Sequence, residues 1–232
     1  MTEDRAVLER DAPGPDETVE YGPAPDQVTD LWHGTGPTVA LVHGGFWRPE
    51  YDRLHLRPMA NALRAAGWNV AVVEYRREPG HPDAAVEDVR AALAALGPAG
   101  GSMVVAGHSA GGHLALLASP QEAGVLALAP VADLGVAHRL DLDEGAVADF
   151  LGGPPDGRPD LDPVRLDAHA GRVTIVHGTE DGRVPVEVSE SYVAAHPGVS
   201  LVRLPGAGHF VVIDPESDVW PIVLRELTAL VR

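Results

Sequence analysis

The sequence predicts an α/β fold built on a doubly wound, mostly parallel sheet with helices on both faces. Apolar runs of strand length alternate with helix-favouring runs along most of the chain, as in successive strand–helix–strand units. Several strand-like runs are continuously apolar, which is typical of strands buried on both faces. The length of 232 residues suits one domain.

The elements are expected where these runs occur. Residues 37–45 read PTVALVHGG, an apolar run that ends in glycines. Residues 53–67 have apolar side chains at helical spacing and end at Gly67, which suits a helix C-terminus. The expected strands are residues 17–22, 27–33, 37–45, 68–75, 103–106, 123–131, 172–178 and 199–206. The expected helices are residues 53–67, 81–97, 110–118, 143–153, 185–197 and 217–232.

The chain divides into an N-terminal arm at residues 1–16 and one domain at residues 17–232. The arm is polar and ends in APGPD, so we expect a loose arm or a short lead-in helix. Within the domain, residues 137–170 interrupt the alternation and are rich in Asp, Pro and Gly. Such insertions often form part of a substrate lid, so we predict a short lid-like insertion there.

Composition narrows the class of partner. The formal net charge is −17, and the 17 basic residues are all arginine. An acidic surface repels nucleic acid and anionic membranes, so neither is expected as a partner.

The absence of cysteine excludes disulfides, thiolate metal sites and a cysteine nucleophile. The charged N-terminus lacks the apolar core of a secretory signal, and no apolar run approaches the roughly 20 residues that span a bilayer. We expect a cytoplasmic protein with a small-molecule substrate, and leave a homodimer open.

The stretch SMVVAGHSAGGHLALLA, residues 102–118, places Ser109 between two glycines where a strand turns into a helix. Glycine tolerates tight backbone approach, so the two glycines indicate a turn too sharp for a Cβ. A G-x-S-x-G sequence in this setting is typical of a nucleophile elbow, which lifts the serine hydroxyl above the sheet edge. We predict that Ser109 is a catalytic nucleophile.

A base and an acid follow in the order Ser109, Asp181, His209 that is typical of this kind of site. His209 lies in the glycine-rich loop after the last strand and is the predicted base. Asp181 lies between a strand and a helix, where it can orient the His209 imidazole. Asp133, after the preceding strand, is the alternative acid. Asp214 is expected to be a cap or turn residue.

Two backbone N–H groups are needed to stabilise an oxyanion. We predict that Ala110 supplies one and that Gly45 or Phe46, in the loop HGGFW, supplies the other. Phe46 and Trp47 are expected to form an aromatic pocket wall, with packing into the core as the alternative for both. His108 is expected beside the substrate pocket, packed at the elbow. His43 and His113 are interpreted as structural residues.

Four motifs in this order resemble an α/β-hydrolase: HGGFW at 43–47, GHSAGGHLAL at 107–116, HGTEDGRVPVE at 177–187 and GAGHF at 206–210. The resemblance runs from about residue 17 to the C-terminus. It is nearest to small bacterial esterases with prolyl-oligopeptidase-like catalytic domains and to the kynurenine formamidase (arylformamidase) group. It implies a single-domain α/β-hydrolase fold.

The predicted activity is that of a serine hydrolase that cleaves a small carboxylic ester or an N-formyl aryl amide through an acyl-serine intermediate. Neither a metal nor an organic cofactor is expected, because the triad and the oxyanion donors supply the chemistry. Two alternatives stay open. One is a biosynthetic acyltransferase or cyclase that uses the same acyl-serine. The other is a non-catalytic ligand-binding protein of the same fold.

Overall fold

A computed structural model describes residues 4–97 and 103–231; the first three residues of the predicted arm lie outside this range. The described residues form one eight-stranded sheet in the order β1-β2-β4-β3-β5-β6-β7-β8. β1 and β2 pair antiparallel, as do β2 and β4, and every other neighbouring pair is parallel. The strands are β1 (Glu17–Glu20), β2 (Val28–Trp32), β3 (Thr38–Val42), β4 (Asn69–Val73), β5 (Met103–His108), β6 (Gly124–Leu128), β7 (Val173–Gly178) and β8 (Ser200–Leu204). The predicted mostly parallel sheet is confirmed.

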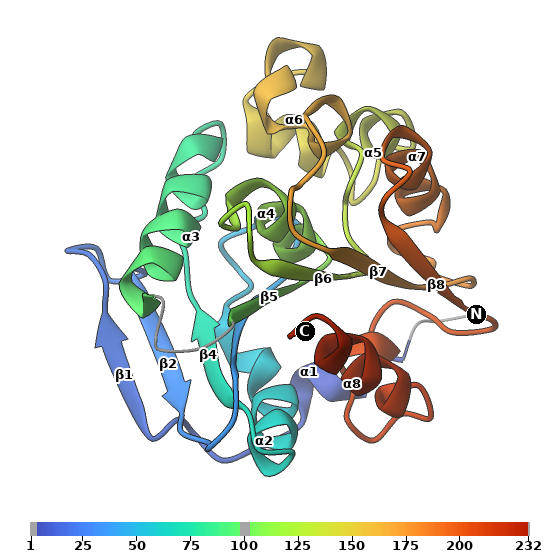
Figure 1. Ribbon diagram of the computed structural model, residues 1–232. Helices are drawn as coiled ribbons and strands as arrows, with labels where there is room; N and C mark the ends of the chain where they lie inside the picture. The colour runs from blue at the N-terminus through green and yellow to red at the C-terminus, as the bar shows by residue number, and fades with distance from the viewer. Residues whose placement is uncertain (1–3, 98–102, 232) are drawn as a thin grey trace.

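Helices cover both faces of this sheet (Figure 1). On one side lie α3 (Pro82–Leu96), α4 (Ala110–Ala118) and α7 (Glu187–Ala195). On the other lie α2 (Arg57–Ala65) and α8 (Trp220–Ala229). Parallel strands require crossover connections, and here the helices supply them.

The core has two parts, one on each face of the sheet. β3 shows the division, since Val39 and Leu41 join one group of buried apolar side chains whereas Ala40 and Val42 join the other. Successive side chains of a strand point to opposite faces, so a continuously apolar strand serves both layers. This double burial explains why the central strands read as unbroken apolar runs.

The predicted helix at residues 53–67 is in fact two elements. A 3₁₀ turn, η1 (Arg53–Leu56), comes first and is capped by the Asp52 carboxylate, which accepts from the Leu54 N–H at 2.8 Å. α2 then starts with Pro58 in its first turn, where a missing N–H costs no helical hydrogen bond. Gly67 follows the helix with a φ of +96°, as its predicted role at the C-terminus requires.

The 137–170 insertion holds more structure than the one helical piece expected. α5 (Leu134–Arg139) begins before it, α6 (Ala146–Leu151) lies inside it, and three short 3₁₀ turns, η2 (Pro155–Gly157), η3 (Pro159–Leu161) and η4 (Pro163–Arg165), complete it. The Phe150 ring of α6 stacks on the Trp47 ring at a centroid distance of 4.3 Å. The insertion thus packs on the loop that follows β3.

The described part of the N-terminal arm packs against the domain and contains the short helix α1 (Ala6–Glu9). Val7 is buried, and Arg10 donates two hydrogen bonds to the Asp214 carboxylate at 2.5 and 3.1 Å. The lead-in helix is therefore confirmed, in a docked form rather than a loose one. No helix within the described ranges is long and apolar enough to cross a bilayer.

Candidate active site

Ser109 lies at the turn between β5 and α4 with φ 55° and ψ −119°, in the region that L-residues rarely adopt. The adjacent glycines are required by close contacts. A Cβ on Gly107 would lie 2.1 Å from the Gly111 carbonyl oxygen, and a Cβ on Gly111 would lie 2.1 Å from the Val42 carbonyl oxygen. The strained geometry is that of a nucleophile elbow, as the sequence predicts.

His209 and Asp181 meet at the same edge of the sheet. The Nδ1 atom of His209 lies 2.6 Å from Oδ2 of Asp181, and both side chains are buried. The other carboxylate oxygen, Oδ1, accepts from the N–H groups of Arg183 and Val184 at 2.8 and 2.7 Å. These bonds hold the carboxylate in one orientation toward the imidazole.

The Asp181 carboxylate is kept ionised by its hydrogen bonds. Burial by itself raises the pKa of this group, but hydrogen bonds from His177 and His209 outweigh it and leave the pKa well below the usual range. His177 lies 3.2 Å from the Oδ2 atom that His209 contacts. A carboxylate at this position can hold the facing imidazole in one orientation.

The alternative acid, Asp133, has a different structural role. One of its oxygens accepts from the Val136 N–H at 2.8 Å and caps α5, and the other accepts from the Ser191 hydroxyl at 2.5 Å. Asp214 pairs with Arg10 and accepts from the Glu216 N–H, which agrees with its predicted turn role. Of these three carboxylates, Asp181 is the one on His209.

The loop after β3 lies directly against the nucleophile. A Cβ on Gly44 would lie 2.9 Å from the Cβ of Ser109, so only glycine allows this approach. Gly45 has a φ of +110°, and Phe46 and Trp47 have φ values of 48° and 56°. Three successive residues with positive φ turn the backbone sharply beside Ser109.

His43 and Glu74 stabilise this loop through hydrogen bonds. Nδ1 of His43 lies 2.8 Å from the Gly44 carbonyl oxygen, and Nε2 lies 2.9 Å from Oε1 of Glu74. Tyr75 stacks on the His43 ring and donates its hydroxyl to the His43 carbonyl oxygen at 2.9 Å. The predicted structural role of His43 agrees with these bonds.

A small cavity of about 30 Å³ lies beside Ser109. Four of the predicted residues, Gly45, Phe46, His108 and His209, line it together with the serine. His108 donates from Nε2 to the His209 carbonyl oxygen at 3.1 Å, and burial lowers its pKa well below the usual value. A neutral His108 can pack against the His209 ring, 4.6 Å away, without charge repulsion.

The prediction that Trp47 forms part of the pocket wall does not match the structure. Trp47 is 3% exposed, stacks on Phe150 and meets the His113 ring edge-on at 5.0 Å. Its positive φ turns the side chain toward the insertion, where it fills the core. The 137–170 insertion likewise contributes none of the described residues that line the cavity. The lid predicted for that insertion is not seen over Ser109.

Six lining residues were not anticipated from the sequence: Arg5, Leu8, Tyr51, His55, Arg183 and Phe210. Phe210 and Arg183 lie within two residues of His209 and Asp181 in the chain, so the sequence could have indicated that they lie near the site. Arg5 and Leu8 belong to the arm, and no local pattern indicates which side chains it contacts. Burial and the nearby His43 lower the pKa of His55 to about 3, so the His55 imidazole in the cavity lining is neutral at pH 7.

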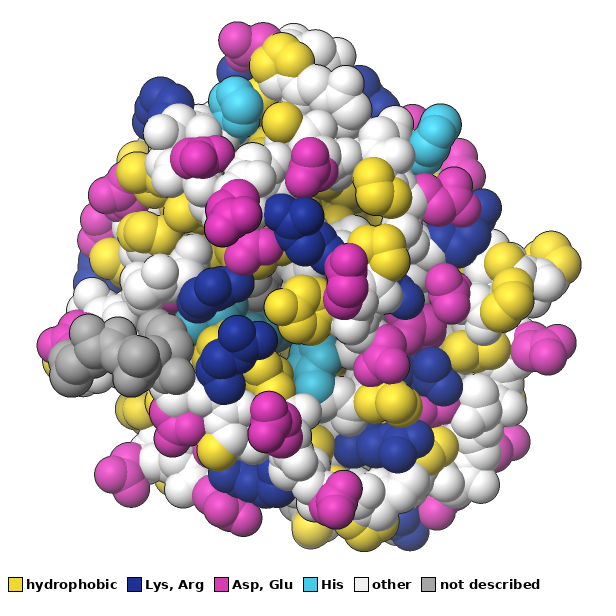
Figure 2. Space-filling model, turned by 180° about the vertical axis from the view of Figure 1, so that it is seen from behind, with side chains coloured by type: hydrophobic (Ala, Val, Ile, Leu, Met, Phe, Trp, Pro, Cys, Tyr) yellow, Lys and Arg dark blue, Asp and Glu magenta, His cyan; other side chains and the backbone are white. Residues whose placement is uncertain are grey.

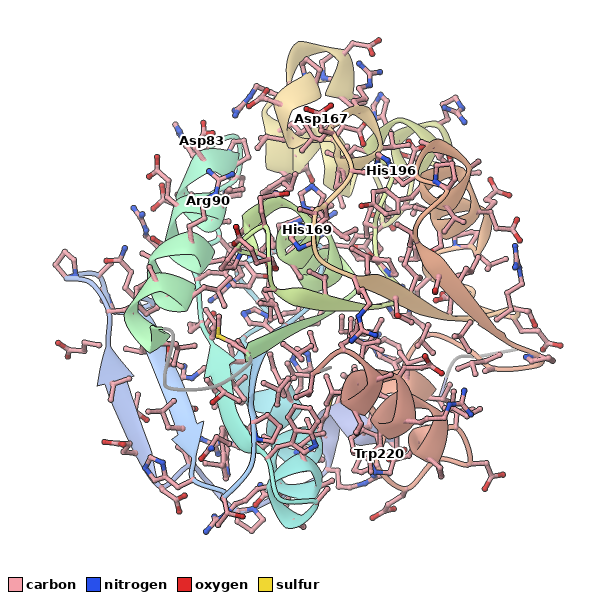
Figure 3. The ribbon with its side chains drawn as sticks, viewed as in Figure 1. Asp83, Arg90, Asp167, His169, His196 and Trp220 are labelled. Carbon is pink, nitrogen blue, oxygen red and sulfur yellow. The ribbon has the colours of Figure 1, made fainter. Side chains whose placement is uncertain are left out.

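Two further histidines, His169 and His196, lie outside the lining of this cavity. His169 and His196 lie on the α4 and α7 side of the sheet (Figure 3), where their Nε2 atoms donate to the Ala123 and Pro163 carbonyl oxygens. On the face seen from behind, arginine and histidine side chains gather near the centre among scattered acidic ones (Figure 2). No group of three or more His, Asp or Glu side chains among residues 4–97 and 103–231 is arranged to hold a metal ion.

The fold is similar to the α/β-hydrolase fold of solved esterases. A family model described as BD-FAE matches residues 32–126, from β2 through the elbow to β6. In the solved structures, esterase B from Lactobacillus rhamnosis, inhibited by a tributyrin phosphonate, superposes with a TM-score of 0.77 at 22% identity, covering 97% of this chain and 90% of that one. An acetyl ester-xyloside bifunctional hydrolase from Caldicellulosiruptor lactoaceticus superposes with a TM-score of 0.70 at 21% identity, covering 94% of each.

Two relatives from Mycobacterium tuberculosis are similar in sequence. Esterase LipC is 28% identical over 241 aligned positions, which cover 84% of this chain. The probable carboxylic ester hydrolase LipM is 33% identical over 116 positions, which cover 43% of this chain. The alignments span 60% of LipC and 26% of LipM, so the chain corresponds to only part of each relative's length.

Proposed function

We propose that the protein is a serine hydrolase that cleaves a small carboxylic ester through an acyl-serine intermediate. The observation that carries this proposal is the 2.6 Å contact of His209 with the ionised Asp181, in a loop that lines one cavity with the strained Ser109. The names of LipC and LipM, an esterase and a probable carboxylic ester hydrolase, support the same reaction class.

In the proposed first step, the Ser109 hydroxyl gives its proton to Nε2 of His209 while Oγ bonds to the substrate carbonyl carbon. The Asp181 carboxylate stabilises the imidazolium that forms. The carbonyl oxygen becomes an oxyanion, and the N–H groups of Ala110 and of Gly45 or Phe46 stabilise it. Removing one such donor typically costs about 3 to 4 kcal/mol of barrier stabilisation.

The intermediate then collapses. Its bond to the leaving oxygen breaks, and the His209 imidazolium protonates that oxygen as the alcohol departs. In the second half, His209 takes a proton from water as the water oxygen bonds to the acyl carbon. The bond between that carbon and Oγ of Ser109 then breaks, and the His209 imidazolium returns the proton to Oγ. The products are one alcohol and one carboxylic acid.

A second candidate is hydrolysis of an N-formyl aryl amide by the same steps. The observation that favours it is the cavity volume of about 30 Å³, because formyl is the smallest acyl group. Phe46 and Phe210 also give this cavity aromatic walls. The leaving atom would then be nitrogen, protonated by His209 as oxygen is in the ester reaction.

The test pairs two assays on the purified protein, with Ser109→Ala as the control in each. One assay is hydrolysis of p-nitrophenyl acetate and butyrate, and the other is hydrolysis of N-formylkynurenine. Ester turnover that Ser109→Ala abolishes supports the main proposal, and dominant deformylation supports the second candidate. Activity of Ser109→Ala near that of the wild type would overturn the proposed mechanism.

Failure of a fluorophosphonate probe to label Ser109 would favour a non-catalytic binding protein. Formation of new esters or amides with added nucleophiles would favour an acyltransferase.

A further inference from the structure

We infer that the N-terminal segment, residues 4–12, forms a wall of the acyl pocket and limits the substrate to a very short acyl group, from formyl to propionyl. This inference rests on the proposed function, because it assigns the acyl side of the same reaction. The juxtaposition that carries it is that Leu8 and Arg5 of the segment line the same cavity as Ser109.

Two spaces at the site share part of their lining. The inner cavity beside Ser109 measures about 30 Å³. One water molecule requires about 10 to 15 Å³ of such space, so the cavity holds only a few non-hydrogen atoms. The outer groove, about 780 Å³, shares Arg5, Leu8, Tyr51 and His55 with the inner cavity. The segment therefore lines both a small space and a large one.

The chemistry of the two spaces assigns the substrate halves. Leu8, Phe46 and Phe210 give the inner cavity apolar walls. The outer groove is lined largely by charged side chains, among them Arg10, Glu50 and Arg57. During the reaction the acyl group stays bonded to Ser109, whereas the leaving group departs to solvent. A small apolar space suits the half that stays, and a large polar groove suits the half that departs.

The segment is held in this position by the loop that carries His209. The guanidinium carbon of Arg5 lies 5.7 Å from the centroid of the Phe210 ring. Arg10, the residue that follows α1, donates two hydrogen bonds to Asp214, which lies four residues after Phe210. Val7, between these points, is 3% exposed and packs into the core. These contacts make a fixed wall out of a segment whose sequence is mostly polar.

The experiment compares kcat/KM for p-nitrophenyl acetate, butyrate and hexanoate in the wild type and in Leu8→Ala. Leu8→Ala removes three carbons from the wall. One methylene in an apolar pocket changes kcat/KM by roughly tenfold or more, so the hexanoate-to-acetate ratio of kcat/KM is expected to rise at least about tenfold. Arg10→Ala, which releases the segment, is expected to raise the ratio in the same direction.

The matched control is Leu166→Ala, at a leucine that is 37% exposed and is not among the described residues that line the cavity. Its ratio is expected to equal that of the wild type. Unchanged ratios in both Leu8→Ala and Arg10→Ala, with acetate turnover retained, would overturn the inference and leave the proposed function standing. Equally good wild-type turnover of hexanoate and acetate would also overturn it. Absence of turnover of every ester by the wild type would instead overturn the proposed ester hydrolysis, and with it this inference.

Discussion

Gly111 of α4 lies so close to Val42 of β3 that a Cβ on the glycine would be 2.1 Å from the valine carbonyl oxygen. β3 leads into the loop that carries Gly45 and Phe46, and α4 follows the nucleophile. The missing side chain thus brings the two halves of the predicted oxyanion site together. Backbone cannot move aside as a flexible side chain can, so this contact is a strict requirement on the sequence.

Gly111→Ala is therefore expected to destabilise the protein by at least about 3 kcal/mol, the upper range for forcing extra atoms into packed structure. The measurement is the free energy of unfolding in urea. The control is Gly153→Ala, because no atom lies within 4 Å of a Cβ at Gly153 and its φ is not positive. Equal stability of the two variants would show that the close contact at Gly111 is absent in solution.

Asp181→Asn is expected to lower kcat/KM by about 10⁴-fold, because an amide no longer stabilises the imidazolium of His209 or holds its tautomer. Asp133→Asn should leave kcat/KM within about threefold of the wild type. It should cost about 1 kcal/mol of stability instead, since Asp133 caps α5. Steady-state kinetics and urea unfolding on both variants test this. A larger kinetic loss for Asp133→Asn would move the acid to the end of β6.

Glu74→Gln is expected to destabilise the protein by about 2 kcal/mol, because it removes the carboxylate that faces the buried His43. It should also lower kcat, since His43 supports the loop of Gly44 and Gly45. Glu78→Gln is the matched control, because its carboxylate is half-exposed and makes a long ion pair with Arg76 at 3.9 Å. Similar losses in both variants would show that the His43–Glu74 pair has no special role.

Stability is expected to fall as the pH drops below about 6.5, earlier than carboxylates alone would cause. Burial lowers the pKa of His113 to about 4 and that of His55 to about 3, so the unfolded chain takes up protons first and acid favours unfolding. Glu74 adds to the loss at lower pH. Burial raises its pKa, but hydrogen bonding to His43 and the charges of His43 and Arg77 lower it to about 2, so its contribution is present above about pH 4.5 and is lost toward pH 2.

The test is urea unfolding between pH 7 and pH 5. In His113→Gln the decrease in unfolding free energy over this range is expected to be smaller by about 2 kcal/mol, since about 1.5 pH units separate pH 5 from the unfolded histidine pKa. The exposed His138 serves for comparison, and His138→Gln should retain the wild-type decrease. An unchanged decrease in His113→Gln would show that His113 is protonated in the folded state.

Much of this site could be read from the order of residues along the chain. The apolar runs predict the strands, and the carboxyl ends of parallel strands meet at one edge, so Ser109, Asp181 and His209 were expected near each other. The predicted elbow was recognisable because its glycines flank Ser109 in the chain, at a turn that leaves no room for a Cβ. Between the two candidate acids no local rule decides. The choice rests on which loop reaches His209, and the structure shows that the loop of Asp181 does.

What the sequence by itself determined was the type and order of the elements and the short set of candidate site residues, because side-chain periodicity and turn chemistry act over a few residues. Only the tertiary structure decided which side chains enclose the cavity. Trp47 was expected in the pocket wall beside Phe46, yet its ring stacks on Phe150, whereas Leu8 from the arm lines the cavity with Ser109. These contacts join residues far apart in the chain. They follow from the packing of all layers at once, which no local pattern records.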